Sequence, residues 1–331
     1  MNNRVVLATV TLMLALTGCP PPGQTGSGGG GGRGGGGGGI AISPDSCGKI
    51  DVNPVGRKVY SFLVASAELD RASIELESSV ADACRKMARI LGVSDAGDTR
   101  QVCTRASQEL QANLQVSVKS ESRLVTKYTP SVCRTDVDFS ASVVAQCEAR
   151  ATADVNVTCD GHCSGTCSGA CSTGGSGGQC AGVCNGRCSG GCDGYANVDA
   201  SAECKASAEI RTTLKTTCTE PKVEVVRQNV TVIDDSKFQK ALAAIDAGLP
   251  QIIRAGKKLE LAGKALVQWV STGASLVRAS GELVGQLGEK GLCVAAQLAA
   301  VVAASANIQA RFSVSIEVSA SVSASAGAQP Q

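Results

Sequence analysis

The sequence is poor in aromatic residues and contains a single histidine. Phe, Trp and Tyr make up 2% of its 331 residues, whereas apolar residues make up 43%. A core must therefore be built mainly from Ala, Val and Leu, which pack in thin, closely approaching layers. This composition predicts an elongated body and argues against an enzyme with a deep aromatic-lined pocket.

Catalytic signatures are also missing. Only His162 is available for a Ser/His/Asp set, and the sequence has no H-E-x-x-H or Walker motif. The formal net charge is +2 at pH 7 and the basic residues form no block, so nothing indicates binding to nucleic acid. We expect a protein that is not an enzyme, needs no cofactor and binds no nucleic acid. The sequence does not identify a ligand.

The N-terminus carries an export signal. Arg4 precedes an apolar stretch that is too short for a stable membrane span, and Leu16-Thr17-Gly18-Cys19 follows it. These four residues resemble the lipobox of bacterial lipoproteins. The resemblance covers residues 1–19 only and implies that Cys19 is lipid-modified and begins the mature chain. The alternative is an ordinary secretory signal in which this cysteine is incidental.

The resemblance also predicts where the protein resides. The family's usual mark for retention at the inner membrane is an Asp after the lipidated cysteine, and Pro20 stands there instead. We therefore expect a cell-envelope protein held at the outer membrane by its lipid. Residues 20–45 are rich in proline and glycine and form a flexible tether, whose glycine part of about 20 residues has a root-mean-square reach of roughly 25 Å.

Cysteine is abundant. Removing Cys19 from the 17 cysteines leaves an even number, which in an oxidising compartment predicts disulfides. Eight lie in the glycine-rich segment 159–192, as two blocks with a cysteine at every fourth position: Cys159, Cys163, Cys167, Cys171 and Cys180, Cys184, Cys188, Cys192.

The positions of the outer cysteines indicate how these blocks pair. Cys147 and Cys204 lie at equal distances from the centre of the segment, between Gly175 and Ser176, and so do Cys133 and Cys218. Such symmetry is typical of an antiparallel hairpin that turns at residues 173–178. It predicts six disulfides: Cys133–Cys218, Cys147–Cys204, Cys159–Cys192, Cys163–Cys188, Cys167–Cys184 and Cys171–Cys180.

The same register predicts extended arms on both sides of the cysteine-rich tip. Odd positions from Val137 to Val157 are almost all small and apolar, and their symmetry mates are too, whereas even positions are mostly polar. This period of two predicts a long antiparallel ribbon over residues 113–235. Cysteines four apart share one face of such a ribbon, each directly opposite its mate, and glycines between them leave room for stacked disulfides. The bridges replace a missing core.

The rival interpretation of the tip is a metal site. Eight thiolates and His162 could hold zinc or copper(I). Zinc ligands usually come as Cys-x2-4-Cys pairs separated by a connecting loop, whereas the uninterrupted Cys-x3-Cys spacing here lacks turns that would bring four sulfurs together. We therefore expect no metal.

The flanking regions have helical periodicity. Residues 46–112 are expected to form a helical hairpin, with a long helix over 56–91 and a second one capped by Asp98. A short helix from Asp235, a longer one from Pro250 and a buried one over 291–306 are expected to pack on this hairpin within residues 236–306. Alternating Val, Ile and Ser residues over 313–326 predict a last strand in the C-terminal segment 307–331.

Four cysteines lie in these regions. Cys84 and Cys103 flank the loop of the helical hairpin at similar distances, which favours Cys84–Cys103 and leaves Cys47–Cys293 to tie the two helical halves together. Three connectivities are open to four cysteines.

The expected fold is therefore α+β, an elongated helical bundle with a long antiparallel β-hairpin ending in a disulfide-laddered tip. The leading functional hypothesis is a membrane-anchored envelope lipoprotein with a structural or binding role, such as adhesion or scaffolding. It would form a homo-oligomer or bind an envelope protein partner, because the apolar face of a lone ribbon needs cover. The alternatives are an oligomeric pore or export component built from amphipathic hairpins, and a Cys-rich metal-binding protein.

Overall fold

A computed structural model of the chain describes residues 41–117, 123–173, 178–180, 182–228 and 231–330. The described residues all belong to one compact unit within residues 39–331. Cys19 and nearly all of the expected tether lie outside the described residues.

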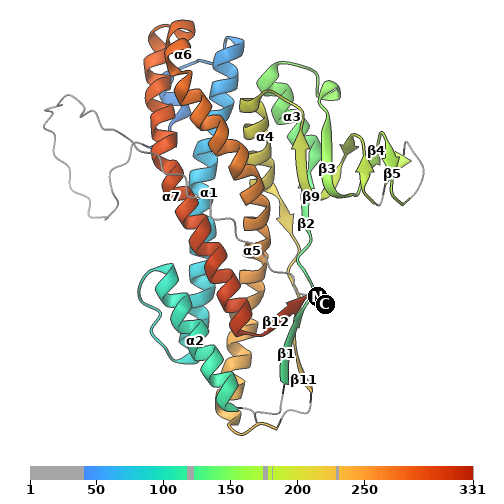
Figure 1. Ribbon diagram of the computed structural model, residues 1–331, viewed down its shortest axis with the longest axis vertical. Coiled ribbons are helices and arrows are strands. Elements are labelled where there is room, and N and C mark those ends of the chain that lie inside the picture. Colours follow the sequence, from blue (N-terminus) through green and yellow to red (C-terminus); the bar gives the residue numbers. More distant parts are fainter. Residues whose placement is uncertain (1–40, 118–122, 174–177, 181, 229–230, 331) are drawn as a thin grey trace, which may run out of the picture. The chain divides into compact units, whose positions relative to one another are not determined.

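Three long helices lie side by side in this unit: α1 Pro54–Leu91, α5 Asp235–Arg278 and α7 Glu289–Ser325 (Figure 1). Two shorter helices, α2 Thr99–Ser117 and α6 Ser280–Leu287, and the 3-10 turn η1 Pro44–Cys47 pack on them. Helices α1 and α2 lie where the sequence predicts them. The side chain of Asn53 accepts the Gly56 N–H at 2.6 Å to cap α1, and the side chain of Asp98 accepts the Gln101 N–H at the start of α2.

Small side chains allow these helices to approach closely. The single tryptophan, Trp269, stacks on Phe62 at 6.4 Å between ring centroids and donates its indole N–H to the hydroxyl of Ser66 at 2.8 Å. At Gly248 a Cβ atom would lie 2.4 Å from Cγ of Met87 on α1. Glycine therefore sets the distance between α5 and α1 at this point.

The C-terminal half differs from the sequence prediction in two places. Pro250 lies inside α5 instead of starting a separate helix, because buried residues continue on both sides of it and tertiary packing outweighs one lost backbone hydrogen bond. The strand predicted over 313–326 is wrong, since α7 continues to Ser325. The buried residues of its last part, Phe312, Ser315, Val318, Ser319 and Val322, follow helical spacing, so serine shares the inner face with the apolar residues.

By length and composition alone, α7 is one described helix that could cross a membrane. Its buried side packs against α1, α2 and α5. The predicted strand residues at its end thus belong to the helical core.

The base of the predicted ribbon is present. Strand β1 Arg123–Tyr128 pairs antiparallel with β11 Val223–Gln228, and β2 Cys133–Asp136 pairs with β10 Thr217–Cys218. Both pairs keep the symmetric register, for example Val125 opposite Val226. The short C-terminal strand β12 Ala328–Pro330 joins β1 in parallel, and β2 also pairs with β9 Gly191–Val198.

The prediction of long extended arms on both sides of the tip is wrong. The segments expected to continue the ribbon form helices, α3 Val137–Glu148 and α4 Ala202–Lys215, which pack against each other. Asp136 caps α3 by accepting the Phe139 N–H at 3.0 Å. Val137, Ser140, Ala141 and Val144 are all buried, at the i, i+3, i+4 and i+7 spacing of one helix face. Ser140 and Val144 occupy even positions of the predicted strand, so the period of two in the sequence does not match the observed burial.

The cysteine-rich tip follows as a set of short strands. Beyond the 3-10 turn η2 Thr152–Asp154, the outgoing chain forms β3 Val157–Cys163, β4 Thr166–Cys167 and β5 Ala170–Cys171. The return chain forms β6 Gly178–Gln179, β7 Cys184–Asn185 and β8 Cys188–Ser189 before β9. The fold is thus α+β, with small, mainly antiparallel sheets beside a helical core.

Candidate functional site

Eight disulfides join the described cysteines. They are Cys47–Cys293, Cys84–Cys103, Cys133–Cys218, Cys147–Cys204, Cys159–Cys192, Cys163–Cys188, Cys167–Cys184 and Cys171–Cys180. The structure therefore brings together each pair proposed from the sequence. The symmetric pairs occur in helices and in strands. Cys147–Cys204 links helices α3 and α4, whereas the inner four bridges lie among strands.

The inner four bridges lie in a coil, not in a flat ribbon. Strand β4 of the outgoing chain has return chain on both sides: Cys167 pairs with Cys188 on one side and with Gly178 on the other. In the same way the N–H of Cys163 donates to the carbonyl of Gly182 at 2.8 Å, although Cys163 also pairs with Cys192. The two antiparallel chains therefore wind around each other. We call residues 157–198 the disulfide coil.

The curvature of the coil explains a shift between two registers. Cys163 lies opposite Cys192 in the β3–β9 ladder but is bonded to Cys188, with their Cα atoms 6.1 Å apart. Along a flat strand the four residues from Cys188 to Cys192 would span about 13 Å. Only a chain that curls can bring Cys163 within bonding distance of Cys188. The expectation that linked cysteines are directly opposite each other is therefore wrong for the inner bridges.

Sulfur fills the interior of the coil. The seven most enclosed of its eight bridging cysteines are 0–5% exposed, and Cys171 at the tip is partly exposed. They form one buried cluster with Val155, Val157, Val198 and residues of α3. The disulfides thus provide the core of a segment that has few other apolar side chains.

Glycine in the coil permits contact between backbones. A Cβ atom at Gly165 would lie 1.9 Å from the carbonyl oxygen of Ser189, and one at Gly169 would lie 2.1 Å from that of Asn185. Gly161 lies opposite Gly194 in the β3–β9 ladder. The sequence-based reason for these glycines, space between stacked disulfides, is replaced by close approach of the two chains.

The outer surface of the coil carries short polar side chains. Exposed positions alternate with cysteine and glycine along the outgoing chain: His162, Ser164, Thr166, Ser168, Ala170 and Ser172. Because β4 lies between β6 and β8, Thr166 has Gln179 on one side and Ser189 on the other. The coil thus presents neighbouring hydroxyl and amide groups on a covalently braced support.

A buried carboxyl group connects the coil to the bundle. Tyr195 on β9 lies beside Glu209 of α4, which is 2% exposed, and Nζ of Lys205 lies 3.8 Å from its Oε1. Burial raises the pKa of Glu209, and the opposing effects of Tyr195, Lys205 and the Val198 N–H are smaller. Burial, together with the neighbouring Glu209, also raises the pKa of Tyr195.

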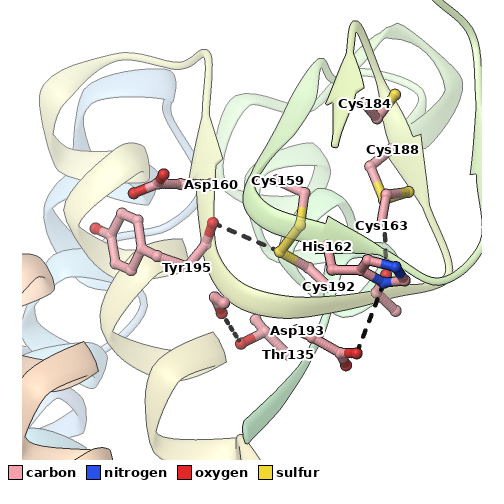
Figure 2. The surroundings of a disulfide bond; sticks show 12 residues. Thr135, Cys159, Asp160, His162, Cys163, Cys184, Cys188, Cys192, Asp193 and Tyr195 are labelled. Carbon is pink, nitrogen blue, oxygen red and sulfur yellow. Dashed lines mark hydrogen bonds and ion pairs between the residues drawn. A yellow bond between two sulfur atoms is a disulfide. The ribbon is translucent and has the colours of Figure 1, made fainter. Parts of the chain in front are cut away.

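Charged contacts surround the first disulfide of the coil (Figure 2). Asp160 and Tyr195 lie on one side of Cys159–Cys192 and His162 on the other. Lys264 of α5 pairs with Asp160 at 2.7 Å and lies over the Tyr195 ring.

Asp193, which follows Cys192, contacts two cationic or titratable side chains near this disulfide. It accepts from Nε of Arg134 at 3.1 Å, whereas Nδ1 of His162 lies 3.9 Å from its second oxygen. His162 is half exposed and next to oxidised cysteines, so it has no thiol to activate. Among the described residues no group of three or more His, Cys, Asp or Glu side chains is arranged to hold a metal ion.

The residues that attach the coil were not found from the sequence. Glu209, Tyr195 and Lys264 come from three separate elements. One signal in the sequence is the spacing of Lys205 and Glu209, which places them on one side of a helix, but the period of two predicts a strand for this segment. Comparisons with protein-family models, with curated proteins and with solved structures found no match for this chain.

Proposed function

We propose that the chain is a lipid-anchored protein of the bacterial cell envelope with a structural or binding role, in which the disulfide coil is the contact surface. The observation that carries this proposal is the coil itself: cystine fills the interior, and hydroxyl and amide side chains occupy the exterior. Such a segment keeps its shape without a large apolar core, and its disulfides suit an oxidising compartment.

The lipobox supplies the anchor in this proposal. Lipidation of Cys19 would place the protein on the outer membrane, with the glycine-rich residues of the tether between the lipid and the body. The partner is an envelope protein or a second copy of the chain. Whether the protein faces the periplasm or the cell surface is left to the experiment.

Expression of the full chain in a bacterium tests the anchor. The wild type should incorporate labelled palmitate and sediment with outer membranes, whereas Cys19→Ala should lose the label. An unlabelled wild-type chain would contradict the lipoprotein assignment. Protease treatment of intact cells then distinguishes a surface-exposed coil from a periplasmic one, and light scattering of the purified protein measures self-association.

The alternative of a pore built from amphipathic hairpins needed extended arms. Those arms are α3 and α4, so we do not propose it. Dye release from liposomes by the oxidised protein would support the pore hypothesis and contradict this choice. A Cys-rich metal-binding role would require free thiols, and the cysteines from Cys47 to Cys293 are all paired in the structure.

A further inference from the structure

A basic pocket lies between the long helices and the base of the ribbon. Its volume is about 310 Å³, and α1, α5 and β10 line it. Arg254 and Lys258, one helical turn apart on α5, face this pocket together with the polar side chains of Ser79, Gln251 and Thr217. We call these five residues the basic pocket.

The two cations of the basic pocket lack carboxylate partners. In the part of the chain that the structure describes, neither Arg254 nor Lys258 forms an ion pair within 4.0 Å, whereas Lys257 and Lys264 on the same helix pair with Glu260 and Asp160 at 2.8 and 2.7 Å. Placing two cations at adjacent turns, both partly buried, costs free energy unless an anion compensates them.

The surroundings of Lys258 also carry more positive than negative charge. Burial lowers the pKa of Lys258, and the nearby charge of Arg254 lowers it further. Glu75 of α1 lines an adjoining pocket of about 150 Å³ with Lys258 but forms no ion pair with it. Lys86, also on α1, does not line the pocket but contacts Gln251, which does, and so adds positive charge nearby.

Hydrogen bonds hold the other polar groups in place. Nε2 of Gln251 donates to the carbonyl of Ser79 at 2.9 Å and to its hydroxyl oxygen at 3.0 Å, and Nζ of Lys86 donates to Oε1 of Gln251 at 3.5 Å. Since the Ser79 hydroxyl accepts this bond, its own proton is available to a ligand. The pocket therefore combines a guanidinium fork, an ammonium and hydroxyl donors.

We infer that the basic pocket binds a phosphate group. Arg254 offers paired N–H donors that match two phosphate oxygens, and Lys258 supplies a point charge one turn away. A volume of about 310 Å³ exceeds the needs of one phosphate, so an esterified phosphate also fits. The source of the group is either a soluble phosphate or a phospholipid headgroup. This inference does not depend on the proposed envelope function.

Calorimetric titration of the full, oxidised chain with inorganic phosphate tests the inference. Arg254→Gln and Lys258→Met should each weaken binding by about 10- to 100-fold, as expected for the loss of a charge-assisted hydrogen bond. Lys240→Gln removes an exposed cation from the same helix and should leave the affinity unchanged. NMR of isotope-labelled lysine should show that phosphate raises the pKa of Lys258.

A second arm uses vesicles of phosphatidylglycerol, with phosphatidylcholine vesicles as a control. Phosphate binding that is lost in both pocket variants supports a soluble ligand. Binding only to the anionic vesicles, lost in the same variants, supports a headgroup. Absence of binding in both arms, or undiminished binding by Arg254→Gln and Lys258→Met, overturns the inference.

Discussion

Cys163 lies opposite Cys192 in the β3–β9 ladder, yet its sulfur is bonded to Cys188. The backbone register and the covalent register of the coil are thus offset by four residues. A flat ribbon would make the two registers coincide, so the offset is the covalent signature of coiling.

The offset can be tested by mapping both the disulfides and the backbone register of the oxidised protein. Non-reducing peptide mass spectrometry should recover Cys163–Cys188, and backbone NOEs in NMR spectra should place Cys163 opposite Cys192. NOEs that place Cys163 opposite Cys188 would instead indicate a flat ladder in which facing cysteines are joined. Free thiols in residues 159–192 would contradict both arrangements and favour a metal site.

Alanine substitution of a coil glycine should be much more harmful than substitution of a helix glycine. Gly165→Ala places a Cβ atom 1.9 Å from the Ser189 carbonyl oxygen, and we expect a loss of about 3 kcal/mol or more in the free energy of unfolding, with mispaired disulfides. The matched variant is Gly263→Ala on α5, where a Cβ atom meets nothing within 4 Å. It should stabilise the protein by roughly 0.5–1 kcal/mol. Denaturant unfolding measures both, and equal effects would contradict the close approach.

Glu209 should make stability depend on pH. Because its pKa is higher in the folded chain than its ordinary value of 4.5, the folded state binds the proton more tightly than the unfolded state does. The stability contributed by the protonated carboxyl is fully present below pH 4.5 and declines as the pH rises through the raised pKa. Glu209→Gln keeps a neutral side chain of similar size that does not titrate, and it should abolish this decline. Unfolding midpoints of both proteins, measured from pH 4 to pH 8, should therefore diverge with pH, and parallel curves would refute the prediction.

The disulfides should contribute unequally. Cys171–Cys180 closes a loop of 9 residues, for which loop entropy gives about 2.6 kcal/mol. Cys47–Cys293 spans 246 residues. Other bridges shorten that loop, but it still exceeds about 100 residues, which corresponds to about 4.7 kcal/mol. Replacing both cysteines of each pair by alanine and comparing denaturant midpoints measures the difference. A larger loss for the tip pair would contradict the order expected from loop length.

The helices illustrate both the reach and the limit of pattern analysis. For α1 the steps of three and four between apolar residues were unambiguous, and the helix lies where they predict it. In α3 and α4 small residues (Ala, Ser and Thr) are mixed with larger apolar residues, and such a pattern is compatible with a strand face and with a helix face. Residues such as Ser140 and Ser207 are buried in the structure, and no local rule assigns serine to a core. The serines of α7 misled the prediction of a last strand for the same reason.

The site divides in a similar way. Cysteine positions are discrete and their symmetry survives any choice of secondary structure, so the sequence alone was sufficient to propose the eight pairs that the structure joins. The contacts that attach the coil, and the unpaired Arg254 and Lys258, depend on which elements become neighbours. Such neighbours are set by packing between distant segments, which one-dimensional spacing does not contain.

The amino-acid sequence by itself determined the centre of the hairpin, the candidate cystine pairs and the long amphipathic helix at the start of the body. These follow from spacing along the chain, and spacing is a property of the sequence. Tertiary structure decided that the arms are helical, that the tip winds into a coil and that each inner cysteine is bonded away from the residue it faces. Those outcomes depend on strand curvature and on which side chains are buried, and both are set by contacts between residues far apart in the sequence.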